Sequence, residues 1–143
     1  MNNKSSIYIS TFKRKGGEGL KTKIITDTNR KQYESLFVEL GDNENPLIVY
    51  FENIQNWVLF TDLRILFSNE GVDAFFNISD IIEVTPAIEE EFKNKVMNKE
   101  EFTRLKVKTR NSDYFICKLE PGLPYQGFYQ MLHFIKTKNT DPN

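Results

Sequence analysis

The sequence predicts an α+β fold in which seven short antiparallel strands are closed by a C-terminal helix. From Pro46 to Glu120, polar and apolar residues alternate in short runs separated by turn residues, which is typical of strands with one face in a core. After Pro124 the apolar residues instead recur three and four positions apart, as on one face of a helix. A chain of 143 residues is long enough for one core but not for two. We therefore expect residues 1–143 to form a single domain.

Residues 1–25 are expected to form an arm rather than part of the core. They begin with a short strand or a loose segment around Ile7-Tyr8-Ile9 and continue into the basic cluster Lys13-Arg14-Lys15. The glycines of Gly16-Gly17-Glu18-Gly19 then predict a flexible loop. This loop lacks the Gly-Lys-Ser/Thr ending of a phosphate-binding loop and does not lead directly into a helix, so we do not interpret it as a phosphate site.

A helix is predicted over residues 29–40, packed on the outside of the domain. Its apolar residues recur at i, i+3, i+4 and i+7, namely Tyr33, Leu36, Phe37 and Leu40. Thr28 or Asn29 can accept hydrogen bonds from the first-turn amides, and Gly41 can supply a left-handed residue that ends the helix.

The clearest pair of strands flanks the turn Asn111-Ser112-Asp113. Before the turn, Thr103, Leu105 and Val107 alternate with the outward residues Arg104, Lys106 and Lys108. After the turn, Phe115, Cys117 and Leu119 supply a matching inner face. Such alternation predicts an antiparallel hairpin with one buried side.

Two helical passages interrupt or end the strands. Thr85-Pro86 is a plausible cap and first position of a short helix in which Ile88, Phe92 and Val96 fall four apart. In that helix Glu89–Lys93 and Glu91–Lys95 have favourable i, i+4 spacing. The final helix, 124–137, has an apolar stripe formed by Phe128, Met131, Leu132 and Ile135.

The order of strands and closing helix resembles the pleckstrin-homology superfold. The segment Trp57-Val58-Leu59-Phe60-Thr61-Asp62-Leu63-Arg64-Ile65-Leu66-Phe67 is similar to a signature of bacterial PH-like (PH/GRAM-like) domains, namely an apolar run, Thr, two residues, Arg and a second apolar run. The resemblance covers residues 46–137 and implies a seven-stranded PH-like barrel or sandwich capped by the final helix. It also implies that Thr61 caps a turn and that Arg64 pairs with an acid or a carbonyl, rather than binding a ligand.

The charge and cysteine content narrow the class of protein. The chain has 19 Lys and Arg against 20 Asp and Glu, whereas nucleic-acid-binding proteins carry a basic surplus, so we expect no nucleic-acid partner. The single cysteine, Cys117, cannot form an internal disulfide, which favours a reducing compartment. We find neither a signal-peptide pattern nor an apolar run long enough for a membrane span. The expected location is cytoplasmic.

No catalytic or metal site is predicted. The only histidine, His133, lies opposite the apolar stripe of the final helix and should face solvent. Cys117 lies on an inward strand face, where burial makes a thiol unreactive. No Cys/His cluster has the spacing of metal ligands. We therefore expect no enzyme, no cofactor and no metal.

The acidic run Glu89, Glu90 and Glu91 is the first candidate binding surface. As a hypothesis, it docks a cationic protein surface, because opposite charge speeds association. The alternative is the solvated face of a short helix.

Basic residues form the second candidate surface, which would contact an anionic membrane. They are Lys13, Arg14 and Lys15 in the arm, and Arg104, Lys106 and Lys108 on the strand before the last turn. Each contributes only about 1 kcal/mol near a charged bilayer, so membrane contact would be weak. The loop 52–56, where the resemblance would place a phosphoinositide site, has no positive charge. The strand carrying Arg104 also shows no interleaved aromatic residues for base stacking.

These observations favour a non-catalytic protein-binding module. A narrower hypothesis is an immunity- or antitoxin-like protein that neutralises a cationic toxin by covering its surface. The alternative is a peripheral module for an anionic membrane surface. Edge strands of an open barrel also make a homodimer conceivable.

Overall fold

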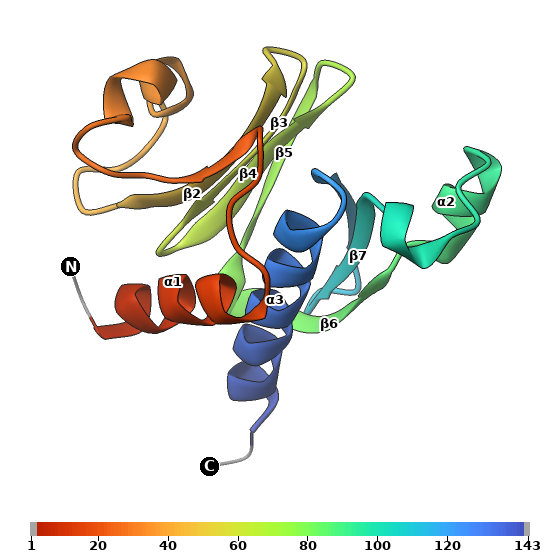
Figure 1. Cartoon of the computed structure of the whole chain (residues 1–143). Coiled ribbons are helices and arrows are strands. Elements are labelled where there is room, and N and C mark those ends of the chain that lie inside the picture. The colour runs from red at the N-terminus through yellow and green to blue at the C-terminus, as the bar shows by residue number, and fades with distance from the viewer. Residues whose placement is uncertain (1–2, 142–143) are drawn as a thin grey trace.

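The computed structural model describes residues 3–141 and shows an α+β fold with two antiparallel sheets and a long C-terminal helix (Figure 1). The helical elements are α1 (Asn3–Lys15), η1 (Arg30–Leu36), η2 (Ile78–Asp80), α2 (Ile88–Lys93), η3 (Lys99–Glu101) and α3 (Leu123–Thr140), where η denotes a 3₁₀ helix. The strands are β1 (Thr22–Ile24), β2 (Pro46–Asn53), β3 (Asn56–Thr61), β4 (Arg64–Asn69), β5 (Val72–Asn77), β6 (Ile81–Pro86), β7 (Arg104–Thr109) and β8 (Tyr114–Lys118).

The strands form one sheet in the order β1-β2-β3-β4-β5 and another in the order β6-β7-β8. Every pair of neighbours is antiparallel. The seven strands predicted after Pro46 are therefore present, and β1 adds an eighth at the edge of the first sheet. The two sheets do not close into a barrel.

The main core lies between the sheets and is closed by α1 and α3. Its largest fully buried side chains include Phe12, Phe60, Leu105, Phe128 and Met131, which come from both helices and both sheets. Burying one such side chain stabilises the fold by about 1.5–3 kcal/mol. The apolar stripe predicted for the final helix is buried here, and the helix begins one residue before Pro124, so this prediction is confirmed.

Residues 3–15 form the helix α1 and not the strand or loose arm expected from the sequence. The side chain of Phe12 is 0% exposed and its ring lies edge-on to that of Phe128, 5.2 Å away. Tyr8, one helical turn before Phe12, packs edge-on against Phe60. The i, i+4 spacing of Tyr8 and Phe12 is compatible with a helix. A helix of this length becomes stable only when such side chains are buried against other elements, which the sequence alone does not show.

Gly16 and Gly19, two of the three glycines that predicted a flexible loop, are instead closely packed, as is Gly127 of α3. A Cβ atom on Gly16 would lie 2.1 Å from the carbonyl oxygen of Leu123, and one on Gly127 would lie 2.8 Å from the ring of Phe12. A Cβ on Gly19 would meet the Glu120 carboxylate at 2.6 Å, and this carboxylate accepts hydrogen bonds from the backbone N–H groups of residues 20 and 21. The segment after α1 is thus fixed against α3 and the end of β8.

The helix predicted over 29–40 is a 3₁₀ helix over Arg30–Leu36, followed by turns. Its hydrogen bonds span three residues, as from Phe37 N–H to the Glu34 carbonyl. Gly41 has no left-handed conformation, and the Asn29 side chain binds Thr26 and Ile24 instead of capping the first turn. The predicted apolar face is nevertheless used, because Leu36 packs on the outer face of the five-stranded sheet.

The short helix α2 begins at Ile88, later than predicted. Thr85 and Pro86 are the last residues of β6, where they pair with Lys106 and Leu105 of β7. Pairing with β7 therefore keeps Thr85 and Pro86 in a strand, although their local sequence favours the start of a helix. Lys95 lies beyond the helix at φ 64°, so the predicted Glu91–Lys95 helical pair does not form.

We predict that Gly127→Ala destabilises the protein although alanine is the better helix former by about 1 kcal/mol. The added methyl group would overlap Phe12 and should cost about 1–3 kcal/mol net, measured by urea denaturation. Gly41→Ala is the matched control, because nothing lies within 4 Å of its added Cβ. A Gly127→Ala protein as stable as Gly41→Ala would contradict the close contact of α1 and α3.

Candidate functional site

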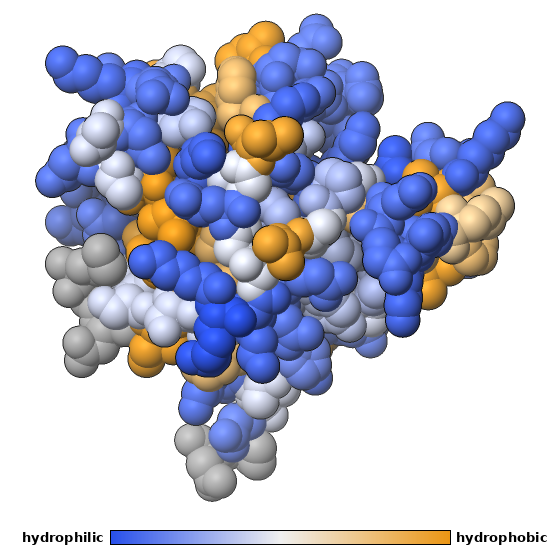
Figure 2. Space-filling model, viewed as in Figure 1, coloured by the Kyte–Doolittle hydropathy of each residue, from blue (hydrophilic) through white to orange (hydrophobic). Residues whose placement is uncertain are grey.

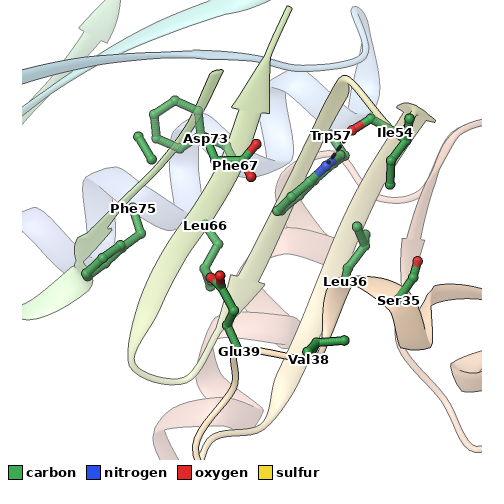
Figure 3. Close-up of a pocket in the computed structure, with 11 residues that line it drawn as sticks. Ser35, Leu36, Val38, Glu39, Ile54, Trp57, Leu66, Phe67, Asp73 and Phe75 are labelled. Atoms are coloured by element: carbon green, nitrogen blue, oxygen red, sulfur yellow. Dashed lines mark hydrogen bonds between the residues drawn. The ribbon is translucent and has the colours of Figure 1, made fainter. Parts of the chain in front are cut away.

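A groove of about 420 Å³ runs along the outer face of the five-stranded sheet (Figure 3). Its floor is formed by Trp57 of β3, Leu66 of β4 and Phe75 of β5. Val38 and Glu39, which follow η1, form one wall. The groove is the part of the outer face of the sheet that η1 leaves uncovered.

Strand register explains why these side chains share one face. Leu59 pairs with Leu66, and Leu66 pairs with Phe75, so the three lie in one row across β3, β4 and β5. The next row is Trp57, Ser68 and Asp73. Because side chains alternate between the faces of a strand, both rows point away from the main core.

The aromatic residues of the groove are held in place while part of each ring stays accessible. Phe75 is 52% exposed, and the Arg64 guanidinium lies 4.9 Å from the centre of its ring. The Trp57 indole N–H donates a hydrogen bond to the Ile54 carbonyl at 3.1 Å. Rings fixed by neighbours lose little entropy when a ligand covers them.

The wall at residues 36–40 is anchored by the buried carboxylate of Glu44. Its Oε2 accepts hydrogen bonds from Thr61 Oγ1 at 2.7 Å and from Arg64 Nε at 2.9 Å, and its Oε1 accepts one from Arg64 Nη2 at 3.1 Å. The same Nη2 donates to the Glu39 carbonyl at 3.0 Å. The guanidinium therefore joins the turn between β3 and β4 to the segment that forms the wall.

The predicted roles of Thr61 and Arg64 are confirmed. Thr61 Oγ1 accepts the backbone N–H groups of Leu63 and Arg64, which caps the turn. Arg64 binds both an acid and a carbonyl. The sequence did not identify Glu44 as the acid, since its carboxylate is one of many and lies in a polar loop.

Burial alone would raise the pKa of Glu44, but hydrogen bonds from Arg64, Thr61 and the Gly41 N–H outweigh it and lower the pKa below the ordinary value. The hydrogen bonds from Arg64 to Glu44 likewise raise the pKa of the guanidinium, although burial opposes this. Both groups are therefore charged at neutral pH.

The groove itself carries negative charge, which the Arg64 guanidinium over the Phe75 ring partly offsets at Glu39. Glu39 and Asp73 line it, and no Lys or Arg does. Within residues 3–141, neither carboxylate has a salt bridge, and Arg64 is committed to Glu44. The groove thus combines apolar and aromatic surface with two acids.

The predicted acidic surface is only partly available. Glu91 is 0% exposed, and its Oε2 accepts the backbone N–H groups of Thr103 at 2.6 Å and Arg104 at 2.9 Å. Its Oε1 lies 2.9 Å from Arg104 Nη1. Glu89 and Glu90 remain accessible, with Glu90 paired to Lys93 at 3.6 Å. Glu91 is therefore buried in internal interactions and is not part of the candidate binding surface.

The basic residues do not form one surface. Arg104 is used by Glu91, and Lys106 and Lys108 lie over the ring of Tyr114, at 4.4 and 5.5 Å. Tyr114 is an aromatic neighbour that the sequence pattern of β7 alone did not show, because it comes from β8. The cluster Lys13, Arg14 and Lys15 ends α1, and α3 lies between α1 and the three-stranded sheet (Figure 1).

Apolar surface is visible in two further places. Figure 2 shows orange surface at the top of the molecule, near the end of the β2–β3 hairpin, and at the right, over α2. Exposed side chains there include Ile54 in the hairpin and Ile88 and Phe92 on α2. The stripe predicted to pack this short helix thus faces solvent at two of its positions.

The remaining candidates for chemistry lie apart from the groove. His133 is exposed on α3, next to Tyr129. Cys117 is buried on β8, as predicted, and burial raises the pKa of its thiol to about 12. Between residues 3 and 141, no three His, Cys, Asp or Glu side chains gather as a metal site would require. Over the same residues, none of the helices has the length and apolar character needed to cross a bilayer.

Comparison with known proteins gives no relative. No family model matches the chain, and neither a curated protein nor a solved structure matches it.

We predict that Glu44→Gln lowers the free energy of unfolding by about 2–3 kcal/mol at pH 7, because the charge-assisted hydrogen bonds to Arg64 are weakened. The folded state lowers the pKa of Glu44, so its stabilisation is present above the ordinary carboxyl pKa and is lost as the pH falls through the lower folded value. Glu44→Gln should therefore flatten the acid side of the stability profile in urea titrations.

The control for this variant is Glu52→Gln, which removes an exposed pair with Lys21 and should cost less than about 1 kcal/mol. Equal losses in the two variants would show that the Glu44 network does not stabilise the fold.

We also predict that Cys117 does not react with Ellman's reagent at pH 8 in the folded protein, since its buried thiol stays protonated. One thiol per chain should react after unfolding in guanidinium chloride. Rapid reaction without denaturant would mean that the three-stranded sheet opens easily.

Proposed function

We propose that this chain is a non-catalytic protein-binding module and that its partner docks in the groove on the outer face of the five-stranded sheet. The observation that supports this most directly is the pair of accessible aromatic rings, the partly buried Trp57 and the exposed Phe75, held in place beside the carboxylates of Glu39 and Asp73. Such aromatic anchors dominate the binding energy of protein interfaces.

The shape of the groove favours a protein over a small molecule. It is open along the sheet, and the residues that line it include the exposed apolar side chains of Val38, Ile54 and Phe75. Small-molecule sites are instead concave and enclose most of the ligand. An apolar area with a polar rim on a monomer is typical of a docking surface.

The negative charge of the groove defines the partner further. A partner with a basic surface would gain from Glu39 and Asp73, whereas an acidic partner would be repelled. A cationic toxin, bound by an immunity- or antitoxin-like protein in the cytoplasm, has this property and is the narrower form of the proposal. A PH-like core agrees with it: strands β2–β5, strands β6–β8 and α3 follow the order expected of that fold.

A second docking surface lies on α2, where Ile88 and Phe92 are exposed beside Glu89 and Glu90. This surface includes Glu89 and Glu90, two of the three acids of the acidic run predicted from the sequence to bind a partner. A membrane contact is less favoured, because the basic residues lie on two separate elements, α1 and β7, with α3 between them (Figure 1), and because Arg104 is paired with Glu91.

The test is affinity capture from the cell of origin with matched surface variants. We predict that a partner held by the unmodified chain is lost, or binds at least tenfold more weakly, with Val38→Lys or Phe75→Ser. Leu20→Ser is the control, because Leu20 is 90% exposed just before β1, at the other edge of the sheet. Circular dichroism confirms that each variant is folded.

Two results would change the conclusion. If Glu89→Lys with Glu90→Lys abolished capture while the groove variants kept it, the docking site would lie on α2. If the chain floated with acidic liposomes at low salt and no groove-dependent partner appeared, the membrane alternative would replace the proposal.

A further inference from the structure

Strand β5 forms an open edge of the sheet next to the groove. It is the last strand in the order and pairs only with β4. Val72, Asp73, Phe75 and Asn77 are all exposed along it. An exposed edge strand presents a row of unpaired N–H and C=O groups that another strand can bind.

The hairpin geometry identifies which backbone groups face outward. Glu70 and Gly71 have φ of 52° and 84° in a two-residue turn, so Asn69 and Val72 form the first hydrogen-bonded pair. Every second pair toward the other end is then hydrogen-bonded, and the bond from Ile78 N–H to the Leu63 carbonyl at 3.1 Å continues the series. The intervening residues of β5 therefore direct their N–H and C=O groups away from β4; they are Asp73, Phe75 and Asn77.

These three residues also have their side chains on the outer face. Asp73 and Phe75 belong to the two rows that form the groove. A strand added to this edge would thus place alternate side chains directly beside Phe75 and Asp73, about 4.5–5.5 Å apart at the Cβ atoms. The backbone edge and the groove are parts of one surface.

The edge lacks the features that usually prevent pairing. β5 contains no Lys, Arg or Pro, and its pairing with β4 has no bulge. β1, at the opposite edge of the sheet, is only three residues long and contains Lys23. β6, an edge of the second sheet, packs against α3. β6 also ends in Pro86, and β8, the other edge of the second sheet, ends in Lys118. Of the four edge strands between residues 3 and 141, β5 is thus the one without Lys, Arg or Pro.

We infer that an extended segment of the partner adds to β5 as an antiparallel sixth strand, with an apolar side chain beside Phe75 and a Lys or Arg beside Asp73. In the antiparallel direction the segment reads apolar, any residue, basic, from its N-terminus onward. This inference rests on the proposed groove and specifies what occupies it. A second copy of β5 fits less well, because that strand contains no Lys or Arg that could lie beside Asp73.

The probe is a synthetic nine-residue peptide of threonines with one Leu and, two residues later, one Lys. In ¹H–¹⁵N NMR titrations its binding should shift and protect from exchange the amides of Asp73, Phe75 and Asn77. A peptide with Glu in place of Lys should bind about fivefold more weakly. A peptide N-methylated at alternate backbone amides that face β5 should not bind, because strand addition needs its N–H groups.

Charge reversal in the protein gives the matched test. Asp73→Lys should bind the Glu peptide better than the Lys peptide, whereas the control Asp113→Lys, in the exposed turn before β8, should keep the original preference. Asp73 is exposed, so this variant should fold.

Three outcomes would overturn the inference. N-methylation without effect would mean that a ligand occupies the groove without joining the sheet. Absence of binding by all peptides, with capture still lost in Phe75→Ser, would overturn strand addition while leaving the proposed function intact. Concentration-dependent dimers in sedimentation velocity that Phe75→Ser dissociates would assign the edge to a second copy.

Discussion

The carboxylate of Glu44 receives hydrogen bonds from Thr61 and Arg64, while Arg64 also binds the Glu39 carbonyl. This set joins three chain segments: the loop before β2, the turn between β3 and β4, and the wall of the groove. Two charges buried together are stable only when each satisfies the other, so the segments are held in one arrangement. Because Arg64 also supports the ring of Phe75, the shape of the groove depends on this single acid.

The close packing of α1 and α3 has the complementary effect on the other side of the molecule. Gly16 and Gly127 let the two helices approach, and Phe12 fills the space between them. The inner faces of both sheets are thereby covered (Figure 1). The outer face beyond η1 and the edge at β5 stay uncovered, and the proposed docking surface lies there.

Several charged residues that the sequence placed on candidate binding surfaces interact with other side chains of the protein. Glu91 and Arg104, assigned to two rival surfaces, form an internal ion pair. Lys106 and Lys108 lie over one tyrosine. The proposed site instead depends on apolar side chains of β3, β4 and β5 and on two acids that form no salt bridge within residues 3–141. A run of charged residues in a sequence does not show whether those side chains are free to bind a partner, because that depends on which residues they contact in the folded protein.

The sequence by itself determined the antiparallel strands after Pro46 and the buried stripe of the final helix, while its resemblance to PH-like domains implied the roles of Thr61 and Arg64. Alternation and helical periodicity are local, so they can be read without knowing what a segment contacts. Only the tertiary structure decided that residues 3–15 form a helix, that Gly16 and Gly127 serve close packing, that Glu44 is the partner of Arg64, and that β5 is an open edge. Each of these depends on which distant segments meet, because burial and pairing are set by contacts between segments and not by any one of them alone.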